Sequence, residues 1–157
     1  MHEPDWSAVC LVARAVASGD RNAYRHAALR SKRTMADVPV FYGYLVLALH
    51  FAVSRLLRGD DSPERVEAFI ERGDVERRRF LSTSEQMFAA SVRYVFDLPV
   101  SGDRVPAAEA IPSLAVSLGL ACRELGIDVE ELRPDVAWYF AEKQRLRAHE
   151  SELDDTT

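Results

Sequence analysis

The feature that most constrains this chain is a run of 17 residues without a charged side chain, Val38–Ser54. A segment of this length and apolarity lies either in the core of a protein or at the lower limit of what can span a membrane. It contains Pro39, Gly43 and His50, and basic residues flank both of its ends, so it carries no signal for an orientation in a bilayer. We therefore expect a buried helix that is surrounded by other helices, and no membrane association.

The residues that punctuate the rest of the chain predict helices throughout. Asp5, Asp20 and Asp37 stand at N-cap positions, and Ser82 begins a capping box that Glu85 completes. Glycines after the apolar patterns are expected to end helices, at Gly19, Gly59, Gly73 and Gly126. The sequence has no alternating strand pattern and no Asn-Gly or Asp-Gly hairpin signal.

These patterns predict an all-α fold. A chain of 157 residues is within the usual size of one domain, about 100–200 residues. We expect a single-domain helical bundle of six to seven helices over residues 1–149, packed around the central apolar helix at about 38–57. The segment 150–157 is acidic and has Leu153 as its one large apolar residue, so we expect it to be a disordered tail.

Charge is distributed unevenly along the chain. The net charge is −5, from 20 basic and 25 acidic residues. Residues 1–58 carry eight basic and four acidic side chains, a local charge of +4, so the remainder carries −9. An acidic chain does not coat nucleic acid over its whole surface, but this asymmetry is typical of a molecule with one face that attracts anions.

The densest basic segment lies between Asp20 and Asp37, and no acidic residue interrupts it. On a helical wheel the charged residues share one side, and alanines occupy the other side. We expect this helix to dock through its alanines and to present outward Arg21, Arg25, Arg30, Lys32 and Arg33. Two interpretations stay open: these side chains bind the phosphate groups of RNA or DNA or an acidic partner, or they pair with the acidic second half of the chain.

Within this segment, Arg21-Asn22-Ala23-Tyr24-Arg25-His26 resembles the Arg-Asn-x-x-x-His motif of HEPN-type ribonucleases. Proteins of that family are small helical bundles, usually dimeric, that cleave RNA without a metal ion. The resemblance implies that Arg21 stabilises phosphate charge, that Asn22 orients reacting groups and that His26 exchanges protons. Side chains five positions apart on a regular helix diverge by about 140°, so we do not expect Arg21 and His26 to form one site within a monomer.

Two further groups of residues are candidates for binding. Gly43, His50 and Ser54 fall within an arc of about 40° on the apolar helix, where they form either a polar seam that lines a pocket or a groove for packing. Trp138 and Arg145 lie on one side of the last helix. Their combination is common at hot spots for protein partners, and a tryptophan packed in the core is the alternative.

The chain carries no motif that indicates a cofactor or a metal ion. Cys10 and Cys122 lie in apolar helical segments, and no cysteines or histidines have the spacing of metal ligands. We expect two buried free thiols in a reducing compartment, and neither metal nor cofactor. The N-terminal residues lack the basic region of a signal peptide, which favours the cytoplasm.

The motif pattern favours a protein without catalytic activity. The sequence has no nucleophile elbow, phosphate-binding loop, dinucleotide fingerprint or zinc-protease motif. We expect a protein-interaction or regulatory module of a bacterial-type cytoplasm, which binds a protein partner or associates with itself as a dimer. The alternative is an RNA-acting or nucleic-acid-binding protein that uses the basic segment, and a third class is an enzyme or ligand-binding protein built on His50. The first two classes are distinguished by whether the basic side chains of this helix pair with acidic residues or are open to solvent.

Overall fold

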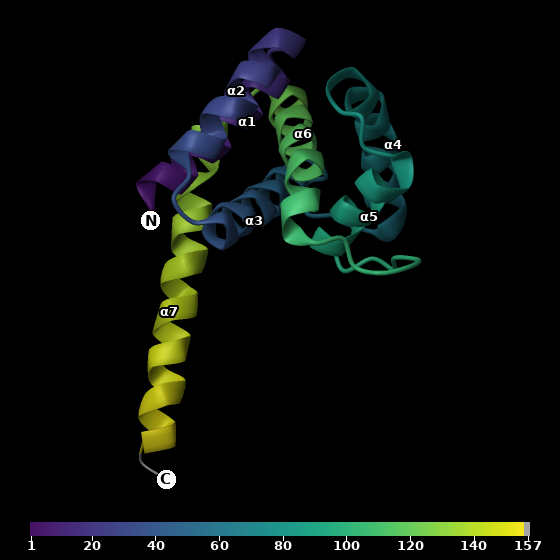
Figure 1. The fold of residues 1–157 in the computed structure, drawn as a ribbon. Coiled ribbons are helices and arrows are strands. Elements are labelled where there is room, and N and C mark those ends of the chain that lie inside the picture. The colour runs from purple at the N-terminus through teal and green to yellow at the C-terminus, as the bar shows by residue number, and fades with distance from the viewer. Residues whose placement is uncertain (156–157) are drawn as a thin grey trace.

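The computed structural model describes residues 1–155, and these residues form seven α-helices and one short 3-10 helix, with no strand among them (Figure 1). In chain order the elements are α1 (Glu3–Ala17), α2 (Arg21–Thr34), α3 (Val38–Leu56), α4 (Pro63–Phe80), α5 (Glu85–Val95), α6 (Ala107–Leu125), η1 (Val129–Leu132) and α7 (Arg133–Asp155). The expected all-α helical bundle is confirmed.

Several helix boundaries arise from the capping residues that the sequence predicts. The side chain of Asp20 accepts hydrogen bonds of 2.8 and 3.2 Å from two backbone N–H groups in the first turn of α2. The side chain of Asp37 accepts one of 3.1 Å from the first turn of α3. These carboxylates satisfy amide groups that have no partner within their own helix. Gly126 ends α6 with a φ of 68°, a left-handed conformation that favours glycine.

Asp5 does not cap α1 as predicted. The helix begins earlier, at Glu3, and the carboxylate of Asp5 is buried against the connection between α2 and α3. Its Oδ1 atom accepts hydrogen bonds from the backbone N–H groups of Ala36 and Asp37, at 2.9 and 3.1 Å. Its other oxygen contacts the ring of His2. Asp5 therefore joins the start of α1 to the end of α2.

Three other helix ends differ from the prediction. Ser84 caps α5 in place of Ser82, since its hydroxyl accepts a hydrogen bond of 3.2 Å from the first turn. The fourth helix continues through Gly73 to Phe80. A Cβ atom at position 73 would lie 2.9 Å from the ring of Phe88, so the glycine leaves room for that ring and does not end the helix. The last helix continues through Asp155, so the segment expected to be disordered from 150 is helical up to that residue. Residues 156–157 of the expected tail lie outside the described residues.

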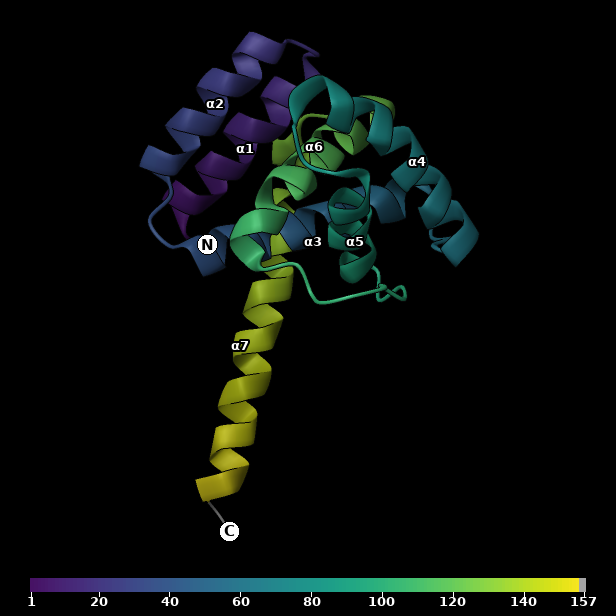
Figure 2. The same cartoon turned by 45° about the vertical axis from the view of Figure 1, so that its right-hand side comes forward.

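The core is centred on α6, and the apolar helix α3 packs along it. Every residue of α6 from Ser113 to Cys122 is buried. Figures 1 and 2 show α6 between the pair α1 and α2 and the pair α4 and α5.

The expectation that α3 is surrounded on all sides is wrong. α3 buries one face, which consists of Phe41, Tyr44, Leu45, Ala48, Leu49, Ala52 and Val53. On the other face, Val46 and Leu47 are half-buried, because the first turns of α7 cover this face only in part.

By length and composition, α3 is the one described helix that could cross a membrane, and 39% of its apolar window is buried within the bundle. The segments Ala107–Leu125 and Val129–Asp155 meet the same criterion only when taken together, and they are bent by 97° at the break between them. The core helix of a soluble protein has the same properties, so this observation alone does not indicate a membrane protein.

α7 leaves the bundle as a projecting rod (Figures 1 and 2). Its first turns are anchored in the body: Val136 is buried, and the ring of Phe140 meets that of Tyr44 edge-on, with 5.0 Å between centroids. Beyond Phe140 the side chains are exposed, apart from that of Glu142, which is half-buried. We call residues 141–155 the arm.

We predict that replacement of Gly119 by alanine destabilises the bundle. A Cβ atom at this position would lie 2.4 Å from the Cβ atom of Val16 and 2.9 Å from the carbonyl oxygen of Ala13, so α1 and α6 would have to move apart. Overpacking of this kind costs about 1–3 kcal/mol, which corresponds to a fall of roughly 3–10 °C in the midpoint of thermal unfolding.

Gly43→Ala is the matched control. A Cβ atom on Gly43 would lie 3.7 Å from the ring of Phe140, an ordinary contact. Because alanine favours a helix over glycine by up to about 1 kcal/mol, we expect this variant to unfold at the same or a higher temperature. Equal destabilisation of the two variants would contradict the close approach of α1 and α6.

Candidate functional site

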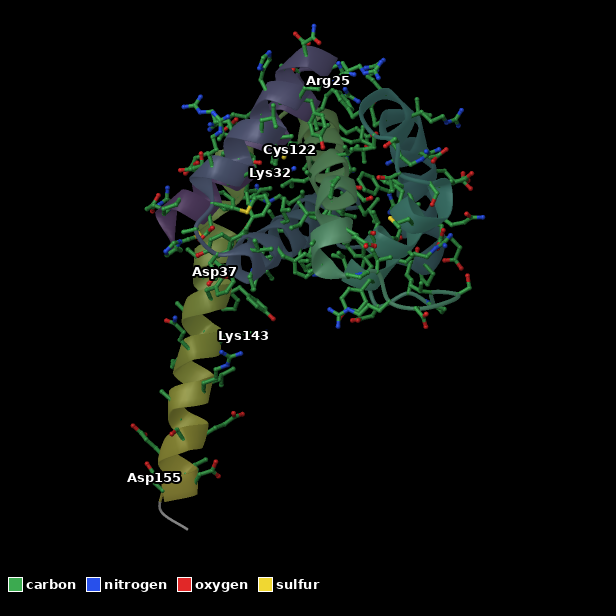
Figure 3. All side chains as sticks on the ribbon, in the orientation of Figure 1. Arg25, Lys32, Asp37, Cys122, Lys143 and Asp155 are labelled. Carbon is green, nitrogen blue, oxygen red and sulfur yellow. The ribbon has the colours of Figure 1, made fainter. Side chains whose placement is uncertain are left out.

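The first candidate site is the basic face of α2, which we define as the side chains of Arg21, Arg25, Arg30, Lys32 and Arg33. α2 packs mainly on α1, and its buried residues are Tyr24, Ala27 and Ser31. All five basic side chains are exposed, and Figure 3 labels two of them, Arg25 and Lys32. Arg30 lies at the edge next to α1, where it lines a cavity with Trp6. The helix therefore has the orientation that its alanine pattern predicts.

Among the described residues, no carboxylate pairs with the basic face. Acidic residues of the second half pair with other arginines instead. Asp128 accepts two hydrogen bonds of 2.8 Å from Arg14, and Glu76 accepts one of 2.5 Å from Arg123. The interpretation that the basic face pairs with the acidic second half is therefore wrong, and the face is open to solvent.

The three residues of the ribonuclease-like motif do not converge. Arg21 is the first residue of α2, and Asn22 and His26 follow it on the same continuous helix. All three side chains are exposed. Because five positions on a helix correspond to about 140° of rotation, Arg21 and His26 point in different directions within one chain.

The structure does not bring Gly43, His50 and Ser54 together as one polar seam. Gly43 faces α7 and lines a cavity of about 360 Å³ whose other walls are mainly apolar. His50 stacks on the ring of Phe96, with 5.6 Å between centroids and 26° between planes. Ser54 is half-buried nearer the end of α3. Neither His50 nor Ser54 lines the cavity at Gly43.

The second candidate site is the outer surface of α7. Trp138 has 63% of its surface exposed, so the alternative of a tryptophan packed in the core is wrong. Arg145, two turns further along, is also exposed and donates hydrogen bonds of 3.1 and 3.0 Å to Glu142. Leu146 and Leu153 add apolar surface to the arm, with 50% and 54% exposed.

Sequence reasoning missed the groove where α7 leaves α3, which we call the α3–α7 groove. It consists of two cavities on either side of Phe140. The larger, of about 580 Å³, lies between the N-terminus and α7, and its polar wall includes Lys143, Gln144 and Arg147. The residues that line this cavity come from both ends of the chain, so the spacing of residues along the sequence does not predict it.

A polar cluster between α1 and η1 was also missed. The carboxylate of Glu130 accepts hydrogen bonds from the indole of Trp6 at 3.1 Å and from the thiol of Cys10 at 3.3 Å, while Arg133 donates to its other oxygen at 3.0 Å. Nearby, the hydrogen bonds from Arg14 hold the pKa of Asp128 below its usual value. The one local signal was the capping position of Asp128.

Both thiols are poor nucleophiles. Burial, followed by the hydrogen bond to Glu130, raises the pKa of Cys10 to about 12. Burial, followed by the charges of Asp128 and Glu131, raises the pKa of Cys122 to about 12. Within the described residues, no three cysteine, histidine or acidic side chains are placed to hold a metal ion.

The fold and these surfaces define a class of protein: a helical bundle with an open basic face and a projecting helical arm. Comparison with protein-family models, curated proteins and solved structures found no match to this chain.

We predict that neither cysteine reacts with a soluble alkylating reagent in the folded protein at pH 8. The thiolate is the reactive form, and a pKa of about 12 leaves only a very small fraction of each thiol ionised at that pH. Mass spectrometry should find no adduct on the native chain and two adducts after denaturation in urea. Rapid modification of the native chain at either position would show that the thiol is accessible.

Proposed function

We propose that this protein is a non-catalytic interaction module of the cytoplasm, which binds a protein partner through the outer surface of α7. The proposal depends on one observation: apolar side chains lie exposed on a helix that projects from the bundle. These side chains are Trp138, Leu146 and Leu153. Large exposed aromatic and aliphatic residues on a regular helix are the usual anchors of a helix that docks against another protein.

The lack of packing along the arm supports this proposal. The packed first turns of α7 nucleate the helix, but in proteins most helical stability comes from the packing of an apolar face. The 15 residues of the arm add no buried residue to the core. A partner that buries the exposed apolar surface would supply the missing stabilisation, at about 25 cal/mol for each Å².

The chemistry of the described residues supports binding over catalysis. The two thiols stay protonated at neutral pH, and Arg21 and His26 diverge on an open helix surface. Free buried thiols also fit the reducing conditions of the cytoplasm.

The proposal predicts that a double variant, Trp138→Ala with Leu146→Ala, loses its partners but keeps its fold. Both side chains are exposed, so their truncation should change the free energy of unfolding by no more than about 0.5 kcal/mol each. Truncation of an interface anchor costs about 2 kcal/mol or more, which is at least a tenfold loss of binding. Cross-linking in cells, followed by mass spectrometry of the captured proteins, measures this loss.

Leu29→Ala with Val75→Ala is the matched control. These side chains are 59% and 60% exposed and lie on α2 and α4, away from α7. The control should capture the same proteins as the wild type. If the arm variant and the control capture the same set, α7 is not the docking element and the proposal is wrong.

A second candidate function is nucleic-acid binding through the basic face. The observation that favours it is that all five cations are exposed and that no carboxylate of residues 1–155 pairs with them, in a chain that has more acidic than basic residues. Arg25, Lys32 and Arg33 lie within about 100° of one another on the helix. Lysine and arginine side chains neutralise phosphate groups and release counterions. Such contacts bind without reading sequence.

This function predicts salt-sensitive binding of the wild type to an RNA hairpin or a DNA duplex. In fluorescence anisotropy at ~50 mM salt, replacement of Arg25, Arg30 and Arg33 by glutamine should weaken binding at least tenfold. The binding should also depend less on salt. In a plot of log binding constant against log salt concentration, the slope should become shallower by up to about 0.9 for each lost phosphate contact. The control replaces Arg58, Arg65 and Arg104 by glutamine, which removes the same charge elsewhere. If the wild type does not bind at this salt concentration, or if both variants lose the same amount of affinity, the basic face is not a nucleic-acid-binding surface.

The wild-type protein and an RNA substrate also test the ribonuclease activity that the motif at residues 21–26 implies. Because Arg21 and His26 diverge, we expect no metal-free cleavage of a structured RNA by the wild type, and no difference in binding for His26→Ala. Cleavage that is lost in His26→Ala would establish a ribonuclease and overturn the non-catalytic proposal.

A further inference from the structure

We propose that the arms of two copies of this chain pair in antiparallel orientation and form a homodimer. This inference rests on the proposed function, since it names a second copy as the partner that covers the arm. The charge pattern of the arm, the positions of its leucines and the groove at its base support this pairing.

The arm separates its charges in an order that does not suit a lone helix. Basic residues occupy its first half, and acidic residues occupy its second half, as Lys143, Arg145 and Arg147, followed by Glu150, Glu152, Asp154 and Asp155. The helix macrodipole favours acidic side chains near the N-terminus of a helix and basic side chains near its C-terminus. The acidic residues of the arm lie near the C-terminus of α7, where the macrodipole disfavours them.

Neighbouring charges within the arm also repel. Lys143 and Arg147 are four positions apart, as are Glu150 and Asp154, and like charges at this spacing destabilise a helix. Glu142, which pairs with Arg145, is the one acidic side chain in the first half of the arm. The arm therefore carries an electrostatic cost that a partner of the right charge order would remove.

A second arm in antiparallel orientation has that charge order. It places the acidic end of each arm beside the basic half of the other. With the leucines at the contact, Arg145 lies on the same flank as Glu152 of the second copy, and Arg147 lies on the same flank as Asp154 of the second copy. A parallel arrangement would instead place like charges side by side. Charge complementarity thus selects the orientation.

The same register pairs the exposed leucines. Leu146 and Leu153 are seven residues apart and lie within about 20° of each other on the helix surface. When Arg145 lies beside Glu152 of the second copy and Arg147 beside Asp154 of the second copy, Leu146 lies beside Leu153 of the second copy. Matching Leu146 with its own copy instead would bring the basic halves together, so the charges favour the register that pairs Leu146 with Leu153 of the second copy.

The α3–α7 groove receives the ends of the paired arms. In this register the acidic end of one arm lies next to the larger cavity of the other chain, whose polar wall includes Lys143, Gln144 and Arg147. The paired segment, residues 144–155, is about 12 residues, or about 18 Å, long. A contact of this length is small for a stable dimer, so we expect reversible association that weakens as salt screens the charges.

Sedimentation equilibrium on the full-length chain at ~50 mM salt tests the pairing by charge exchange. The wild type should associate. Two double variants, Arg145→Glu with Arg147→Glu and Glu152→Arg with Asp154→Arg, bring like charges together across the contact. Each should raise the dissociation constant at least tenfold. An equimolar mixture of the two variants should form a heterodimer, and all four substitutions in one chain should restore the homodimer. Arg58→Glu with Arg104→Glu is the control and should associate like the wild type.

Cysteine cross-linking tests the orientation. Leu146→Cys and Leu153→Cys introduce accessible thiols on the arm, whereas the native cysteines are buried. Antiparallel pairing should give oxidised dimers in a mixture of the two variants and few in either variant alone. Efficient cross-linking within each variant alone would show parallel pairing and overturn the inference.

A wild-type chain that stays monomeric at the highest concentration, or charge variants that associate as tightly as the wild type, would also overturn the pairing. Loss of the proposed function is measured separately, by the proteins captured in cells. A monomeric chain that still captures another protein through Trp138 and Leu146 would refute self-pairing alone, and the interaction module would stand.

Discussion

The close approach of α1 and α6 is the contact on which the rest of the structure depends. At Gly119 the two helices approach so closely that no side chain fits between the backbone of α6 and Val16. This contact buries the middle of α6 completely, and α6 then supports α3 on one side and the pair α4 and α5 on another. Since α2 packs mainly on α1, the position of the basic face is also fixed by this crossing.

Ion pairs at the surface have a different role from the core. Exposed pairs contribute about 0–1 kcal/mol each, so Arg14 with Asp128 and Arg72 with Glu124 add little to the stability of the fold. Their acidic members, Asp128 and Glu124, pair with these arginines and not with the basic side chains of α2.

The sequence predicts the features that depend on neighbouring residues. The caps Asp20 and Asp37 and the end of α6 at Gly126 act within a few positions, and the structure contains all three. Features that depend on distant contacts could not be predicted in this way. Asp5 binds amide groups 31 and 32 positions away, so its capping pattern was misleading. The composition of α2 indicated a basic surface, but its lack of carboxylate partners depends on where every acidic residue lies in space. The exposure of Trp138 likewise depends on the path of α7 away from the bundle.

The anchoring of α7 relates the two candidate surfaces to each other. η1 and the first turns of α7 are fixed by Leu132 and Val136 in the core, so the direction of the arm is set by the body. Figure 1 shows α2 at one end of the molecule and the arm at the other. In an antiparallel dimer the two bodies would lie at opposite ends of the paired arms, and each would present its basic face away from the contact. Two weak anion-binding faces held on one particle bind a long polyanion more tightly than either face alone, provided that the separation fits. The dimer contact and the basic face are therefore compatible on one molecule, because neither surface covers the other.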